Sequence, residues 1–173
     1  MSKFRYNLLT MLRSYEPVPI GTTSDFPTTE DIGRPVARAD AASAANLEHN
    51  ADNYIIVGDG VAFESVIASV NSSEPTQDGF VMGSIVIPEP FKTRIHCINS
   101  GTTALKVGDL VVAGDNGTAH TTHNALLRVK ISSTDQVFRW QVKSLNGGNG
   151  AQNTHVIIEF IGHVSSVKPT SLT

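Results

Sequence analysis

The stretch Lys106–Ala119, KVGDLVVAGDNGTA, decides the fold class of this 173-residue chain. Its apolar run LVVA is framed by Gly-Asp on one side and by Gly-Asp-Asn-Gly on the other. Apolar β-branched residues favour strands, whereas Gly, Asp and Asn favour the tight turns that end them. The stretch therefore predicts strand, tight turn and strand. It offers no nucleophile, no phosphate cradle and no convincing metal set, so it favours a β-rich binding or structural module over an enzyme.

The same pattern extends over the region from Asp31 to Thr173. Short runs rich in β-branched residues alternate there with turn residues, and segments of helical periodicity are scarce. This favours a mainly β fold, an antiparallel β-barrel or sandwich, over a parallel α/β sheet. In the exception, Ala37–His49, the alanines permit either a short helix or an ordered loop. We predict strands at Tyr54–Val57, Phe63–Val70, Phe80–Ile87, Arg94–Ile98, Asp109–Ala113, Leu126–Ile131, Val137–Lys143 and Val156–Ile161.

The N-terminal segment Ser2–Tyr15 has the spacing of a short amphipathic helix. Its apolar residues recur mostly three and four positions apart, which places them on one helical face. Because so short a helix is marginal in isolation, this face must cover either a partner or the chain's own β domain. The predicted partner-binding residues on this face are Phe4, Leu8, Met11, Leu12 and Tyr15.

The segment Glu16–Glu30 contains Pro17, Pro19 and Pro27 among small and polar residues. Because proline opposes both helix continuation and sheet pairing, we predict a stiff, extended linker here. The chain then divides into two regions. Residues 1–30 form an extended or short-helical docking arm with its linker, and residues 31–173 form the β-barrel or sandwich domain.

The composition argues against several classes of function. Hydrophobic residues make up 40% of the chain, which is enough for the core of one domain. The net charge of −3 gives no general attraction to nucleic-acid phosphates or to an anionic membrane, so we expect neither partner. No stretch approaches a membrane span, and the N-terminus lacks the apolar core of a signal peptide. We therefore expect the chain to be made and kept in a cytoplasm.

Candidate catalytic and metal-binding residues are sparse. His120 and His123, in the turn HTTHN, come nearest to a metal-ligand pair, but no third ligand lies near them in the sequence. His96, His155 and His163 lie on predicted strands as ordinary sheet residues. The motif search finds no Gly-Lys-Ser/Thr phosphate loop, no G-x-S-x-G elbow and no G-x-G-x-x-G fingerprint. We expect no catalytic residue, no metal and no cofactor.

Other conspicuous residues have structural explanations. Asp59, Asp109 and Asp115 each follow a glycine and suit tight turns. The single cysteine, Cys97, lies in an apolar alternation and is expected to be buried. Trp140 is expected in the core or at an interface, because a stacking platform for a sugar or base needs neighbouring aromatics.

Two segments resemble the core pattern of the head decoration, or cement, proteins of tailed bacteriophages. The segments are Asp31–Val36, DIGRPV, and Val57–Ile87, VGDGVAFESVIASVNSSEPTQDGFVMGSIVI. The matching features are a Gly-Asp after an entry strand, a strand leading into Ser-Val, and Asp-Gly-Phe followed by a glycine and an apolar strand. In this chain they are Gly58-Asp59, Ser69-Val70, Asp78-Gly79-Phe80 and Gly83. The opening stretch Lys106–Ala119 is similar to a strand-turn-strand of small β-barrel head proteins.

The resemblance implies a structural virion protein without catalytic activity. Proteins of this family bind in many copies to the assembled capsid shell, often as trimers, and clamp neighbouring subunits against internal DNA pressure. The implied partners are the major capsid protein and further copies of the chain in a homotrimer. The implied location is the capsid surface of the virion, after synthesis in the host cytoplasm.

Two other functions stay open from the sequence. A receptor- or carbohydrate-binding module of a phage tail or fibre would be indicated by an exposed aromatic cluster around Trp140. An enzyme would be indicated if His120 and His123 converged with a carboxylate around a pocket.

Overall fold

The computed structural model describes residues 7–8, 15–21, 28–38, 53–75, 80–114 and 127–163. In these residues the regular structure is strand, apart from the short 3-10 helix η1 at Thr29–Asp31. The predicted mainly β fold class is confirmed. The strands are β1 (Asn7–Leu8), β2 (Tyr15–Gly21), β3 (Pro35–Arg38), β4 (Tyr54–Ile56), β5 (Ser65–Pro75), β6 (Phe80–Val86), β7 (Arg94–Asn99), β8 (Leu110–Ala113), β9 (Leu127–Ile131), β10 (Phe138–Ser144) and β11 (His155–His163).

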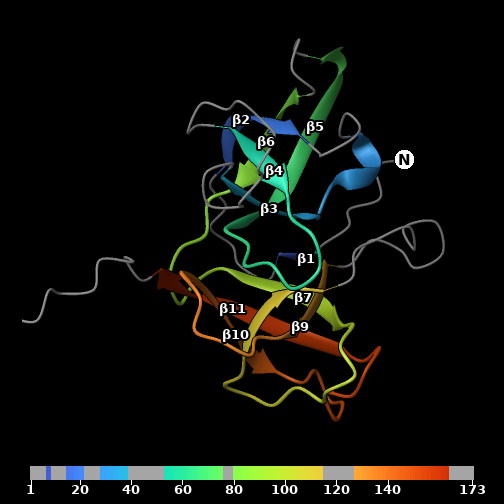
Figure 1. Ribbon diagram of the computed structural model, residues 1–173, viewed down its shortest axis with the longest axis vertical. Helices are drawn as coiled ribbons and strands as arrows, with labels where there is room; N and C mark the ends of the chain where they lie inside the picture. The colour runs from blue at the N-terminus through green and yellow to red at the C-terminus, as the bar shows by residue number, and fades with distance from the viewer. Residues whose placement is uncertain are drawn as a thin grey trace, which may run out of the picture.

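Strands β2 to β6 form a closed barrel in the order β2-β4-β3-β5-β6, called the first barrel below. β2 runs parallel to β4, and each other pair of neighbours is antiparallel. In Figure 1 this barrel forms the upper part of the molecule, coloured blue to green. Closure pairs the edges that an open sheet would expose.

Strands β7 to β11 form a second sheet in the order β7-β11-β10-β8-β9, with β1 added beside β7. A parallel pairing of β7 with β9 joins the two ends of this order. The five strands therefore make a ring of hydrogen-bonded neighbours, called the second ring below. It lies in the lower part of Figure 1, coloured yellow to red.

The second ring repeats the topology of the first barrel strand by strand. In both, the first strand is parallel to the third and antiparallel to the fifth, and the second strand pairs with the third and the fourth. The registers also agree. The pair Val36↔Ile56 corresponds to Val111↔Ile131, each residue number being higher by 75. The sequence alone shows no repeat, because few residues are identical at this spacing, among them Gly33/Gly108, Val36/Val111, Ile56/Ile131, Phe63/Phe138, Ser69/Ser144 and Asn71/Asn146.

Irregular features recur at equivalent places in the two units. The register of β5 on β6 shifts between Ile67 and Ser69, and that of β10 on β11 shifts between Val142 and Ser144. The turn before the second strand also recurs. Gly33 N donates to Ile67 O at 2.8 Å, and Gly108 N donates to Val142 O at 2.9 Å. Both glycines have positive φ, 88° and 98°, a conformation that glycine adopts without steric cost.

One continuous hydrophobic core joins the two units. At its centre Trp140, only 1% exposed, stacks on Phe63 of the β4–β5 connection, with ring centroids 5.2 Å apart. The indole Nε1 also donates to Phe63 O at 3.1 Å. The indole also contacts Phe160 of β11, with ring centroids 5.1 Å apart. The predicted burial of Trp140 in the core is confirmed, and this residue ties the second ring to the first barrel.

The predicted N-terminal linker is wrong over residues 16–21. These residues belong to β2, which pairs with β6 along its whole length, from Tyr15↔Val86 to Gly21↔Phe80. Sheet tolerates the prolines because Pro17 and Pro19 lie two residues apart and so direct their missing donors to the same side of the strand. In the described residues, β4 pairs with β2 at Ile20 and Gly21 alone. The first barrel therefore includes a strand from the segment assigned to the arm.

The other predictions of secondary structure have clear outcomes. The eight predicted strands are confirmed as β4 to β11, with ends shifted by up to five residues. The helix predicted over Ser2–Tyr15 is absent from its described residues, because Asn7–Leu8 is strand β1 and Tyr15 begins β2. In the segment Ala37–His49, residues 37 and 38 belong to β3, and residues 39–49 lie outside the described residues.

Candidate functional site

The structure separates the two predicted arm residues whose backbone it describes. Leu8 lies on β1 and pairs with Ile95 of the second ring, whereas Tyr15 begins β2 of the first barrel. Both backbone segments contact the chain's own sheets. The remaining three predicted residues, Phe4, Met11 and Leu12, lie outside the described residues.

The residues considered for chemistry are also placed apart. His120, His123 and Asp115 lie outside the described residues. Asp109 accepts a hydrogen bond from Lys106 N at 2.7 Å, which is the turn role predicted for it. The predicted burial of Cys97 is confirmed, and burial raises the pKa of its thiol, so that the unreactive protonated form is favoured.

An exposed aromatic residue lies in the connection between the two units. Phe91 is 67% exposed and has a φ of 60°, although its bulky side chain disfavours that conformation. Its backbone N donates to Phe160 O at 2.7 Å. The same turn is held by Thr93 Oγ1, which accepts from Glu89 N at 2.8 Å, and by the 2.9 Å ion pair of Lys92 with Glu89. The connection thus presents an aromatic ring to solvent on a fixed backbone.

The two units use equivalent connections differently. In the first barrel, the β4–β5 connection docks on the second ring. Gly60 N donates to Ala113 O at 2.8 Å, Ala113 N donates to Val61 O at 3.0 Å, and Lys130 pairs with Asp59 at 2.6 Å. Asp59, predicted as a turn residue, therefore also bridges the units.

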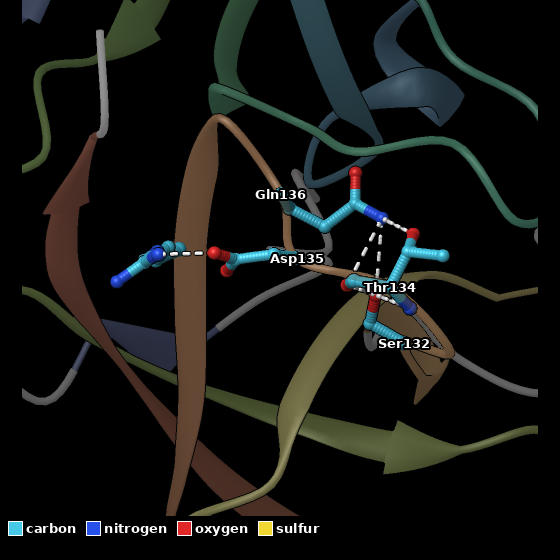
Figure 2. Close-up of polar contacts among 5 residues, drawn as sticks. Ser132, Thr134, Asp135 and Gln136 are labelled. Carbon is cyan, nitrogen blue, oxygen red and sulfur yellow. Dashed lines mark hydrogen bonds and ion pairs between the residues drawn. The ribbon is translucent and has the colours of Figure 1, made fainter. Parts of the chain in front are cut away.

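The β9–β10 connection of the second ring is bonded to itself, as Figure 2 shows. The Gln136 amide donates to Ser132 Oγ at 3.0 Å and to Thr134 Oγ1 at 2.8 Å. Asp135 Oδ2 pairs with Arg139 Nη2 at 2.5 Å. These bonds within the loop and to Arg139 of β10 give the loop a defined shape at the surface.

A charged cluster covers the outward face of the second ring. Glu159 of β11 is paired with Arg94 of β7 at 2.7 Å and with Lys143 of β10 at 3.1 Å, and its side chain is only 4% exposed. Burial by itself would raise the pKa of Glu159, but the hydrogen bonds from Arg94 and Lys143 hold that pKa below its ordinary value. The cluster joins three neighbouring strands by charge.

The first barrel carries a different polar cluster. Tyr54 Oη accepts from Arg38 Nε and donates to Glu64 Oε1, each at 3.1 Å. Burial, with a smaller contribution from the Glu64 charge, raises the pKa of Tyr54 to about 12. A phenol with such a pKa stays protonated near neutral pH and does not serve as a base. The arrangement is that of a structural hydrogen-bond network.

Two histidines of the second ring meet on its outward face. His96 lies on β7 and His155 begins β11, and Nε2 of the first is 3.0 Å from Nδ1 of the second. Burial and the neighbouring His155 lower the pKa of His96, which favours its neutral form. His163 lies near the other end of β11, beside Phe138.

Sequence reasoning missed both the histidine pair and Phe91. The alternation in β7, with Ile95 and Cys97 inward, already places His96 outward, but it does not show which residue of another strand lies beside it. Only the pairing of β7 with β11 brings the two rings together. Phe91 had a usable signal, since it is a large apolar residue among Pro88, Glu89, Pro90 and Lys92.

Comparisons with protein-family models, curated proteins and solved structures find no significant match. Among the described residues, no group of three or more His, Cys, Asp or Glu side chains is placed to hold a metal ion. The same residues contain no helix with the length and apolar character needed to cross a membrane. The described clusters are ion pairs and hydrogen bonds that fix strands, loops and the junction between the two units.

Proposed function

We propose that the chain is a structural virion protein that decorates and stabilises an assembled phage capsid by binding the major capsid protein. The sequence resemblance to head decoration proteins suggests this function. The observation that carries the proposal is the preorganised apolar turn at Phe91, set between two rigid β units. Fixed apolar groups bind a partner without a large ordering cost.

The proposed contact is Phe91 together with its neighbour Ile87, which is 40% exposed. A non-glycine residue held at positive φ costs free energy, and such strain clusters at binding sites. Here the hydrogen bond to Phe160 O and the Glu89–Lys92–Thr93 turn maintain the strained conformation. An aromatic side chain presented in this way suits an apolar pocket between capsid subunits.

Repetition strengthens this mode of attachment. A chain that binds as a homotrimer presents the same contact three times, so weak single contacts add up when their spacing matches the lattice. The pairing of β1 with β7 attaches this part of the N-terminal segment to the chain's own sheet, so the proposed contact with the capsid is placed at Phe91 and not on the arm.

The alternative of a carbohydrate- or receptor-binding fibre module has less support. An exposed aromatic cluster around Trp140 would favour this alternative. Trp140 is instead buried in contact with Phe63 and Phe160. We further propose that the protein has no catalytic activity of its own.

Cosedimentation with undecorated, expanded phage heads tests the proposal. We expect saturable binding at a simple ratio to capsid subunits and a raised rupture temperature of the heads. Phe91→Gly should weaken binding at least about tenfold, as for a residue of an interface hot spot. Its own thermal stability should hold or rise, because glycine relieves the positive φ.

Val107→Ala is the matched control, since Val107 is also a highly exposed apolar residue, at 63%. It should bind like the unmodified chain. Absence of any saturable binding to the heads would reject the capsid proposal. Unchanged binding by Phe91→Gly would reject Phe91 as the contact.

A further inference from the structure

The outward face of the second ring holds a compact group of nitrogen-bearing side chains. His96 Nε2 and His155 Nδ1 lie 3.0 Å apart, and the two ring centroids are 4.9 Å apart with planes inclined by 43°. The Asn146 side-chain amide lies 3.4 Å from His96 Nε2. Three polar groups from β7, β11 and the β10–β11 turn thus face one another at the surface.

The spacing of the two ring nitrogens matches that of neighbouring ligands on one metal ion. Two imidazole nitrogens about 2.0–2.1 Å from a zinc ion, at a ligand angle of roughly 90–109°, lie about 2.8–3.4 Å apart. The observed 3.0 Å falls in that range.

We propose that His96 and His155 bind a divalent transition-metal ion that prefers imidazole ligands, with zinc as the reference ion. His96 binds through Nε2 and His155 through Nδ1, while water fills the remaining positions. Binding replaces the contacts that His96 Nε2 makes with the Asn146 amide and with His155 Nδ1, because one nitrogen lone pair cannot both accept a hydrogen bond and bind the ion. Neutral imidazole is the usual zinc ligand at such a site.

The sheet fixes both ligands before any ion arrives. In the antiparallel pairing of β7 with β11, His155 is opposite Ile98 and His96 is opposite Ile157, so the two histidines are diagonal neighbours. The other edge of β7 is paired at His96 with Asn7 of β1. A site on paired strands needs little reordering on binding, which favours affinity.

The first barrel provides an internal comparison. By register, Pro17 of β2 and Met82 of β6 occupy the positions of His96 and His155, because Pro19↔Met82 corresponds to Ile98↔His155. Neither proline nor a thioether replaces imidazole as a zinc ligand. The proposed site therefore belongs to the second ring and does not follow from the shared backbone alone.

Calorimetric titration of the full chain with zinc chloride at neutral pH tests the proposal. The double variant His120→Ala/His123→Ala serves as the starting protein, since it removes the other histidine pair of the sequence. We expect one zinc ion per chain in this variant. Adding His155→Ala should weaken zinc binding more than about tenfold, whereas adding His163→Ala should leave it unchanged.

His155 is exposed, so its replacement should leave the fold intact, which circular dichroism checks. Nitrogen-15 NMR of the histidine rings gives a second readout. Zinc should shift the Nε2 resonance of His96 and the Nδ1 resonance of His155, and leave the ring of His163 unshifted. Absence of saturable binding in the double variant, or equal affinity with and without His155, would overturn the proposal.

Discussion

The first barrel and the second ring share one backbone plan but carry different side chains on it. Trp140, with its large buried indole, stands where the first barrel has Ser65, whose Oγ donates to Val86 O. Glu159, with its two cationic partners, stands where the first barrel has Val86. The strand register and the bulge are common to both units. The plan is thus compatible with very different core and surface chemistry.

The difference shows which features specify the plan. Gly33 and Gly108 are retained at the turn that precedes the second strand, with the same hydrogen bond to the fourth strand. Side chains at other equivalent positions change size and polarity while remaining buried. Backbone geometry at a few turns and the inward alternation of apolar residues are sufficient to set the register.

The largest expected effect comes from removing β2. Deletion of residues 1–30 removes Val18 and Ile20 from the core and opens the first barrel. We expect this variant to lose the cooperative thermal unfolding of the full chain and the native fluorescence of Trp140, which stacks on Phe63 of the adjoining connection. Scanning calorimetry and fluorescence measure both effects.

Deletion of residues 1–14 is the matched control, because it removes β1 and leaves β2 complete. It should unfold cooperatively at a temperature close to that of the full chain, since β1 pairs through two residues. If the longer deletion were as stable as the shorter one, β2 would not be a structural part of the first barrel.

A smaller effect is expected at the pair of equivalent positions Trp140 and Ser65. Trp140→Ala should lower the free energy of unfolding by about 3–5 kcal/mol, as for large-to-small changes at buried aromatics. Ser65→Ala should cost about 1–3 kcal/mol, because it leaves a buried carbonyl without its partner. Denaturant unfolding of both variants measures the difference. Similar losses would mean that Trp140 does not hold the two units together.

Much of the fold could be predicted from the sequence where β-branched runs end at turn residues. Strands β4 to β11 all have this signature, and the prediction of a barrel or sandwich followed from the frequent turn signals and the scarcity of helical periodicity. β2 was missed because its prolines suggest a linker, and local composition does not show that β6 pairs with the segment that contains them. β3 is short, and its pattern PVAR merged with the alanine-rich segment that follows it.

The candidate sites were harder to predict because they depend on contacts between distant residues. His96 and His155 are 59 positions apart in sequence and meet through the pairing of two strands. Arg94 and Glu159 are separated by 65 positions and meet in the same way. The repeated topology was hidden for a related reason, since register is a property of backbone hydrogen bonds and tolerates almost any outward side chain.

The smallest expected effect is a difference between the two units in how the pH changes their contribution to stability. The pKa of Glu159 is held below its ordinary value, so the folded state binds fewer protons than the unfolded chain near the ordinary glutamate pKa of about 4.3. The contribution of its ion pairs is complete above that pH and is lost as the pH falls through the lowered pKa. Val86, at the equivalent position of the first barrel, has no such dependence.

Glu159→Gln should therefore be less stable than the unmodified chain at neutral pH and lose less stability on acidification. Denaturant unfolding at neutral pH and at about pH 3.5, below the ordinary glutamate pKa, measures how much stability each protein loses on acidification. Asp135→Asn is the control, because its carboxylate forms one ion pair on an exposed loop, where such pairs contribute little. An equal loss of stability in the Glu159→Gln variant and the unmodified chain would show that the acid sensitivity does not arise from this cluster. The Glu159 charge would then be tolerated at this position of the shared backbone plan without contributing to stability.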